Sequence, residues 1–191
     1  MIEGDSIRTG VTAILPRGAN KPIYQQPCFA NGFSFNGKGE MTGIHLLAET
    51  GFLGSPILIT STHSVGIGYE STLKWMIQES EIPLINLENV GLPVVAETWD
   101  GYLNDYRHFP IKEEHVFEAL NNAKISSSFV AEGNVGGGTG MITLGYKAGT
   151  GTSSRVIPEL NYTVGVLVQS NFGRKKQLVI AGVPVGEEIL E

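Results

Sequence analysis

Cysteine is nearly absent from this chain of 191 residues, because Cys28 is the only one. A single cysteine excludes an intrachain disulfide and any metal site with Cys-x-x-Cys spacing. It permits a reducing compartment without requiring one. Cys28 has no catalytic partner nearby in the sequence, so we interpret it as a small core residue rather than a nucleophile.

Long apolar runs and basic clusters are also missing. No stretch approaches eighteen apolar residues, and the first ten residues do not form a signal peptide, so we expect a soluble, cytoplasmic protein without membrane contact. Thirteen basic residues against nineteen acidic ones give a net charge of -6. The only basic cluster, Arg174-Lys175-Lys176, is too small for nucleic-acid binding.

Histidine is scarce too, and its spacing excludes common metal motifs. None of the four histidines belongs to a His-Glu-x-x-His pattern, so we expect neither a metal nor a cofactor. His63 follows a predicted strand and precedes a predicted helix, where catalytic side chains often lie. A packing or capping role for His63 is the favoured alternative.

Glycine, by contrast, is abundant. Eight of the nineteen residues from 133 to 151 are glycine. The run lacks both the Walker pattern and a proper Gly-x-Gly-x-x-Gly, so a phosphate cradle is less favoured than close-packed turns. The following Thr150-Gly-Thr-Ser-Ser154 suggests a hydroxyl nucleophile freed by cleavage after Gly151, but serine and threonine beside glycine are more often turn formers.

Hydrophobic periodicity predicts a single α+β domain over residues 1–191. We expect two helices, at about 64–79 and 110–124, on a mostly antiparallel sheet. The predicted strands are residues 11–15, 56–60, 92–96, 127–131, 141–146, 153–157, 162–169 and 177–183. Residues 44–48 are too short a run to assign.

Two polar residues follow apolar runs at predicted strand ends. Glu97 ends Val94-Val-Ala-Glu97, and Asn171 follows Val166-Leu-Val-Gln-Ser. A carboxylate in such a position can hold a cation, and an amide N–H can stabilise an oxyanion. Position alone leaves ordinary solvated strand ends equally plausible. Trp99 either walls a pocket or packs.

Several stretches together resemble the DmpA-type family of L-aminopeptidase/D-esterase enzymes and their β-peptidyl aminopeptidase relatives. They occur in consistent order along nearly the whole chain: residues 7–18, 36–43, 62–66 (THSVG), 97–101 (ETWDG) with 103–105, 132–141 (EGNVGGGTGM), 151–155 (GTSSR), 162–169 with Asn171 and Gly173, and 182–186 (GVPVG).

The resemblance implies an αββα sandwich and a precursor that cuts itself into α and β polypeptides. The new N-terminal serine of the β polypeptide is the nucleophile, and it follows the Gly-Val-Pro-Val-Gly stretch in the family. This chain then corresponds to the α polypeptide, without the nucleophile. Larger oligomers of α/β heterodimers are also implied.

The resemblance also implies roles for individual residues. Asn171 matches the oxyanion-hole asparagine, and Glu97 matches the acid thought to hold the substrate's free ammonium. Trp99 stands where related enzymes can carry a tyrosine, so a role for that tyrosine's hydroxyl does not transfer to the indole. Thr152 and Ser153 no longer fit a nucleophile. Together with Asn134, Gly136 and Gly137 they are expected to line the site.

The function expected from the sequence is therefore that of a self-processing aminopeptidase, amidase or esterase that works through an acyl-enzyme. Its substrates would be small peptides, amides or esters. The alternative is a non-catalytic small-molecule binding or structural subunit on the same scaffold.

Overall fold

The computed structural model describes residues 1–18, 26–80, 91–125 and 129–189. A three-stranded sheet lies at the centre, with strand order β3 (Val11–Ile14), β6 (Ile57–Ser61) and β7 (Val94–Thr98). β3 pairs with β6 antiparallel, and β6 pairs with β7 parallel. The parallel pair directs the carboxyl ends of β6 and β7 to the same edge of the sheet, which is where the candidate site lies.

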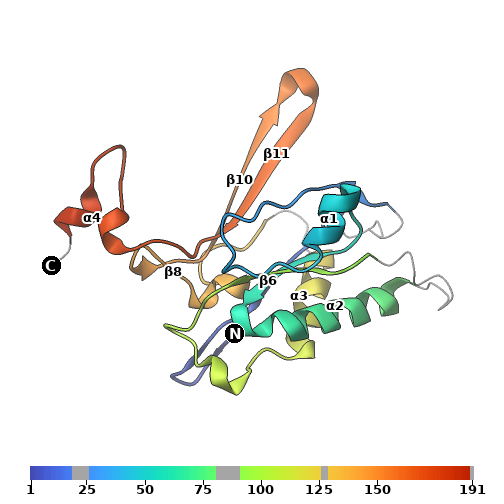
Figure 1. The fold of residues 1–191 in the computed structure, drawn as a ribbon, viewed down its shortest axis with the longest axis horizontal. Helices are drawn as coiled ribbons and strands as arrows, with labels where there is room; N and C mark the ends of the chain where they lie inside the picture. Colours follow the sequence, from blue (N-terminus) through green and yellow to red (C-terminus); the bar gives the residue numbers. More distant parts are fainter. Residues whose placement is uncertain (19–25, 81–90, 126–128, 190–191) are drawn as a thin grey trace.

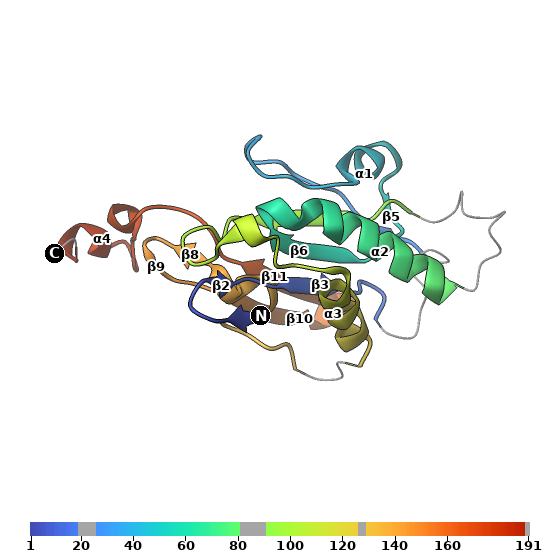
Figure 2. The ribbon, with the colours of Figure 1, turned by 90° about the horizontal axis from the view of Figure 1, so that it is seen from below.

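Helices α2 (Val65–Ser80) and α3 (Glu113–Ile125) pack against one face of this sheet and against each other (Figure 2). The core between them is built from apolar side chains at strand period two and helix period three to four. Its buried members are Val11, Leu58, Trp75, Met76, Val95, Ile111, Val116 and Leu120. Both predicted helices are confirmed with small shifts of their bounds.

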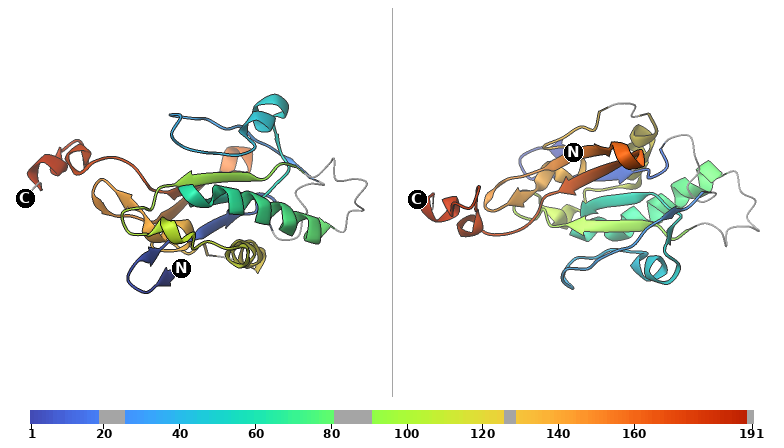
Figure 3. Two further views of the ribbon diagram at one scale, coloured as in Figure 1. Left: turned by 60° about the horizontal axis from the view of Figure 1, so that its bottom comes forward. Right: turned by 90° about the horizontal axis from the view of Figure 1, so that it is seen from above.

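A smaller apolar cluster covers the other side of β6 and β7. Leu47 of α1 (Ile44–Thr50) and Leu53 of β5 (Phe52–Leu53) are buried against Val94. Strand β4 (Cys28–Phe29) pairs with β5, and half-buried Cys28 packs against this cluster. Figure 3 shows α1 and the α2–α3 pair on different sides of the sheet. The core role predicted for Cys28 is thus consistent with its place.

The glycine run forms a short 3-10 helix, η4 (Gly136–Gly140), packed across β3. A Cβ added to Gly10 would lie 2.1 Å from the Gly136 carbonyl oxygen, and one added to Gly140 would lie 2.1 Å from the Arg8 carbonyl oxygen. Gly136 also has a positive φ of 52°. Glycine is therefore required at these positions, because a side chain would collide with the backbone of the neighbouring segment. The expected close packing is confirmed, but as a 3-10 helix rather than a hairpin turn.

Strands β10 (Thr150–Ile157) and β11 (Tyr162–Gln169) form a long antiparallel hairpin that projects from the rest of the chain (Figure 1). Their register runs from Thr150 opposite Gln169 to Ile157 opposite Tyr162. The 3-10 turn η5 (Pro158–Leu160) connects them, with Asn161 left-handed at φ 53°. Most of the hairpin is exposed.

The remaining elements are short. They are β1 (Ile2–Glu3), β2 (Ile7–Arg8), η1 (Thr62–Ser64), η3 (Tyr106–His108), β8 (Ile142–Thr143), β9 (Tyr146–Lys147), η6 (Lys175–Gln177) and α4 (Val185–Glu188). β1 pairs with β2, and β8 pairs with β9. The segment with η6 and α4 extends away from the central sheet (Figure 1).

Three strand predictions need correction. Of the strand expected at 127–131, residues 127 and 128 lie outside the described residues and 129–131 are not extended in a sheet. The run at 141–146 divides into β8 and the start of β9, because left-handed Leu144 and Gly145 turn the chain. Residues 177–183 hold only a bridge between Ile180 and Val183. The strand pairs of the described residues are antiparallel, as expected, with the exception of the parallel β6–β7 pair.

No helix in the described part of the chain combines the length and the apolar character needed to cross a membrane. Within the same residues, no three histidine, cysteine, aspartate or glutamate side chains gather as a metal site would require.

Candidate active site

Glu97 lies at the carboxyl edge of the parallel β6–β7 pair. It stands opposite Thr60 in the register, and β6 ends one residue later, at Ser61. Its half-buried carboxylate accepts a short hydrogen bond from the Thr62 hydroxyl through Oε2. The backbone N–H of Glu40 donates to Oε1 at 3.4 Å. The carboxylate is therefore held from two directions.

Asn171 reaches the same edge from the end of the β10–β11 hairpin. Its Oδ1 accepts from the Trp99 backbone N–H at 2.9 Å, and its Nδ2 donates to the Trp99 carbonyl at 3.0 Å. The Nδ2 group also donates to the Ile142 carbonyl at 3.2 Å. The side-chain amide thus pairs with the Trp99 backbone much as a neighbouring strand would. Asn171 thus binds the chain two residues after Glu97; we call Glu97, Trp99 and Asn171 the edge site.

Trp99 presents its indole at the surface of the edge site. The ring is 41% exposed and meets Tyr102 edge-on, with ring centroids 4.8 Å apart. A Cβ on Gly101 would lie 2.7 Å from the indole, so only glycine lets the ring lie in this place. The indole therefore does not fill the core.

A chain of hydrogen bonds runs from Thr98, within the strand that carries Glu97, through Gln169 and Thr12 to Gly137. The sequence did not predict these bonds. Gln169 donates from Nε2 to the Thr98 hydroxyl at 2.5 Å and accepts from the Thr12 hydroxyl at 3.0 Å. Thr12 in turn accepts from the Gly137 backbone N–H at 3.0 Å. A Cβ on Gly137 would lie 2.5 Å from Gln169 Oε1. Gln169 lies two residues before Asn171, and alternate residues of an extended chain point to the same face. This spacing is the sequence signal that could have identified Gln169.

The other predicted lining residues divide into two groups. Gly136 and Gly137 belong to the support beneath the edge site. Asn134 instead lines an open hollow of about 490 Å³, together with Thr143 and Lys147. Burial there lowers the pKa of Lys147, whose ammonium donates to the Gly138 and Ala148 carbonyls at 3.3 and 2.5 Å.

Thr152 and Ser153 lie on the exposed hairpin, opposite Leu167 and Val166. The Thr152 hydroxyl and backbone N–H donate to Glu132 Oε1 at 2.5 and 2.7 Å. These bonds lower the pKa of Glu132, the hydroxyl bond contributing more than the backbone bond. The Thr152 hydroxyl and backbone N–H thus hold the Glu132 side chain against the exposed hairpin.

His63 stacks on Tyr106, with ring centroids 4.1 Å apart and an angle of 7° between the rings. This contact favours the packing role over the catalytic one. Tyr106 begins η3, in the segment that follows the edge site and returns toward β2.

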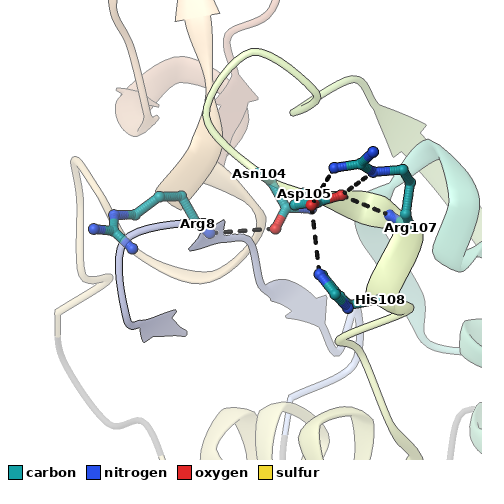
Figure 4. A network of polar contacts seen from close by, with 5 residues as sticks. All are labelled: Arg8, Asn104, Asp105, Arg107 and His108. Carbon is teal, nitrogen blue, oxygen red and sulfur yellow. Dashed lines mark hydrogen bonds and ion pairs between the residues drawn. The ribbon is translucent and has the colours of Figure 1, made fainter.

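The η3 segment is fastened by a polar network (Figure 4). Asp105 accepts from Arg107 Nε and Nη2, both at 2.7 Å, and His108 Nε2 lies 3.4 Å from Asp105 Oδ2. The Arg107 hydrogen bond is the largest cause of the lowering of the Asp105 pKa to about 2. Asn104 Oδ1 accepts from the Arg8 backbone N–H at 3.2 Å and ties the segment to β2.

Comparison with known proteins places the chain in a family. A sequence profile of Peptidase family S58 matches residues 1–191. Beta-peptidyl aminopeptidase BapA of Sphingosinicella microcystinivorans is 47% identical over 188 residues, which are 96% of this chain and 44% of that protein. The chain therefore spans about half the length of the curated relatives it matches.

Solved structures give the same result at the level of the fold. A crystal structure from Pyrococcus horikoshii OT3 superposes with a TM-score of 0.89 at 40% identity, covering 99% of this chain and 55% of that one. The L-aminopeptidase D-Ala-esterase/amidase of Ochrobactrum anthropi, a variant of the Ntn hydrolase fold, superposes at 0.83 with 43% identity, covering 97% and 51%. The mixed helices and sheets of this chain are thus those of the matching half of an Ntn-type hydrolase. With a profile match over its full length and relatives at this identity, the chain belongs to peptidase family S58.

Proposed function

We propose that this chain is the α polypeptide of a self-processing aminopeptidase that also accepts amides or esters. The observation that carries the proposal is that the Asn171 amide binds the backbone of Trp99, two residues after Glu97, whose half-buried carboxylate is held by Thr62 at the end of the same sheet edge. A carboxylate beside an amide donor suits a substrate with a free ammonium next to the carbonyl that reacts.

The proposed reaction is acyl transfer to a serine at the N-terminus of a downstream β polypeptide. The serine oxygen attacks the substrate carbonyl, its proton passes to a base and then to the leaving amine or alcohol, and water hydrolyses the acyl-enzyme. Glu97 would bind the substrate's ammonium. This pairing restricts the enzyme to the amino end of its substrates.

Asn171 would stabilise the oxyanion through Nδ2. Both of its N–H groups point at carbonyl oxygens, those of Trp99 and Ile142. The Ile142 bond is the longer, at 3.2 Å, so this N–H is the one that the oxyanion would share or take over. A developing negative charge is a stronger acceptor than a neutral carbonyl, which favours that exchange in the transition state.

We further propose that the β polypeptide completes an αββα sandwich by covering the projecting hairpin. Val164, Val166 and Val168 alternate along β11 and are each about half exposed, at 51%, 51% and 50%. Their face also bears Ile157 and a shallow apolar hollow of about 340 Å³. A monomer rarely leaves such a valine row uncovered, because burying it is favourable. Assembly of the α/β heterodimers into larger oligomers belongs to the same proposal.

The test is to express the full-length coding sequence that contains this chain and to examine its product on a denaturing gel. Two bands, a serine at the N-terminus of the smaller one, and release of aniline from aminoacyl anilides are expected. A single unprocessed band without activity on anilides, amides or esters would contradict the proposal and favour a binding or structural subunit.

A further inference from the structure

Two acidic side chains, one near the end of β7 and one just after it, accept hydrogen bonds from hydroxyl groups at and just after the end of β6. Ser61 donates from Oγ to Asp100 Oδ1 at 2.9 Å, and Thr62 donates from Oγ1 to Glu97 Oε2. Asp100 is only 2% exposed, so the Ser61 bond belongs to a buried structural contact. Glu97, by contrast, is half-buried at the edge site, where a ligand can reach it.

The Thr62 hydroxyl is aimed at Glu97 by the backbone. The parallel register sets Thr60 opposite Glu97 and Ser61 opposite Thr98, and η1 begins at Thr62 as the chain turns into α2. Ser61 is the residue that precedes η1, and no side chain caps its first turn. The Thr62 hydroxyl bonds to Glu97, and its β-branched side chain has few rotamers to choose from.

We propose that Thr62 is the positioning residue that fixes the Glu97 carboxylate for recognition of the substrate's ammonium. An ionised carboxylate has about four lone-pair sites. Thr62 occupies one on Oε2 and the Glu40 N–H occupies one on Oε1, which leaves acceptor sites on both oxygens for an ammonium. Holding the carboxylate in one rotamer before the substrate arrives removes an ordering cost from binding. This inference rests on the proposed function.

The first experiment compares Thr62→Val with wild type in the processed enzyme, on an aminoacyl anilide and on the analogue that lacks the amino group. Loss of a hydrogen bond to a charged group should raise KM for the amino substrate about 10-fold. KM for the desamino analogue should change little, because the analogue offers no ammonium to Glu97. The value of kcat should also change little. Thr62→Ser, which keeps the hydroxyl, should remain close to wild type, and Thr62→Ala should behave as Thr62→Val.

A matched control is Thr50→Val in α1, whose hydroxyl donates to the Leu46 carbonyl at 2.8 Å away from the edge site. This control should leave both substrates unaffected. If Thr62→Val does not process, the comparison between Thr62→Ala and Thr62→Ser decides the question. An equal rise in KM for both substrates would show a general structural role and overturn the proposal.

A double-mutant cycle with Glu97→Gln separates this inference from the proposed function. Glu97→Gln alone should raise KM for the amino substrate, and Thr62→Val should then add little, because the charge it positions is gone. Additive effects would overturn the positioning role. If Glu97→Gln raises KM but Thr62→Val does not, only the Thr62 proposal fails. If Glu97→Gln leaves KM unchanged, the ammonium site itself is wrong and both proposals fail.

Discussion

Asn171 is a single side chain that makes three hydrogen bonds to backbone groups of two segments. Two of the three go to Trp99, so the amide holds the chain directly after Glu97 as well as offering a donor. The two roles call for different atoms, since Oδ1 only accepts and only Nδ2 can stabilise an oxyanion. Substitutions at this residue can therefore tell them apart.

We predict that Asn171→Ala lowers kcat about a hundredfold or more, the range found for removal of one oxyanion-hole donor. Asn171→Asp should lower kcat similarly, because it keeps an acceptor for the Trp99 N–H but loses both N–H donors. The measurement is steady-state turnover of an aminoacyl anilide by the processed fraction. Wild-type turnover in Asn171→Asp would exclude the donor role and leave a structural one.

Trp99 illustrates how glycine permits an exposed ring at a site. Its indole needs the space that Gly101 leaves, and its backbone is occupied by Asn171. The sequence left open whether Trp99 packs or walls a pocket. Its exposure and the edge-on contact with Tyr102 show that it does not pack in the core, and a role in walling a pocket stays a prediction.

At the scale of elements, the η3 segment connects the edge site to β2 through polar contacts. Asp105 accepts from the backbone N–H of Arg107 at 3.2 Å, forms an ion pair with its guanidinium and lies near His108. Its pKa falls to about 2 from the ordinary 3.8. Because the folded pKa is lowered, this carboxylate stabilises the fold above about pH 4, and the stabilisation is lost as the pH falls through 2.

We predict that Asp105→Asn lowers the thermal midpoint at pH 7, and that the difference from wild type shrinks as the pH falls from about 4 toward 2. Asparagine keeps an acceptor for the Arg107 N–H, so the change reports the charge. Melting curves at several pH values measure it. Asp5→Asn removes a charge from another exposed turn and serves as the control. A difference that persists undiminished at the lowest pH would contradict the ion-pair explanation.

At the scale of the whole molecule, the hairpin is a large exposed element with a row of valines along one face. In the register, Val166 stands opposite Ser153 and Thr163 opposite Val156, so these two β11 residues point to opposite faces. The valine face has no cover within the described chain, whereas Thr152 on the other face is bonded to Glu132. The valine face is therefore where we expect the second polypeptide to pack.

We predict that Val166→Lys in the full-length protein weakens association of the α and β polypeptides. Burying a lysine without a partner costs far more than the roughly 1.5–3 kcal/mol that burial of the valine contributes. Size-exclusion chromatography after processing measures the association. Thr163→Lys places the same charge on the opposite face of the same strand and should have a smaller effect. Equal effects of the two variants would argue against packing on the valine face.

The sequence by itself determined the elements that a pattern of neighbouring residues is enough to predict. Apolar runs located the three central strands and helical periodicity located α2 and α3, because each buries one continuous face. The density of glycine in 133–151 correctly indicated tightly packed backbone. The ordered motifs identified the family, and strand ends singled out Glu97 and Asn171. The sequence misplaced the strands at 141–146 and 177–183, where left-handed residues and short turns outweigh β propensity.

Only the tertiary structure decided which side chains meet. Glu97 and Asn171 are 74 residues apart in the sequence, and the base of the hairpin brings the Asn171 amide to the backbone of Trp99, two residues after Glu97. The same folding places Thr152 and Ser153 on the exposed hairpin, and it gives contacts at the edge site to Thr62 and Gln169, which lie in the matching stretches but had been assigned no role. A carboxylate becomes a binding group through the donors that orient it, and those donors come from segments whose proximity the sequence does not encode locally.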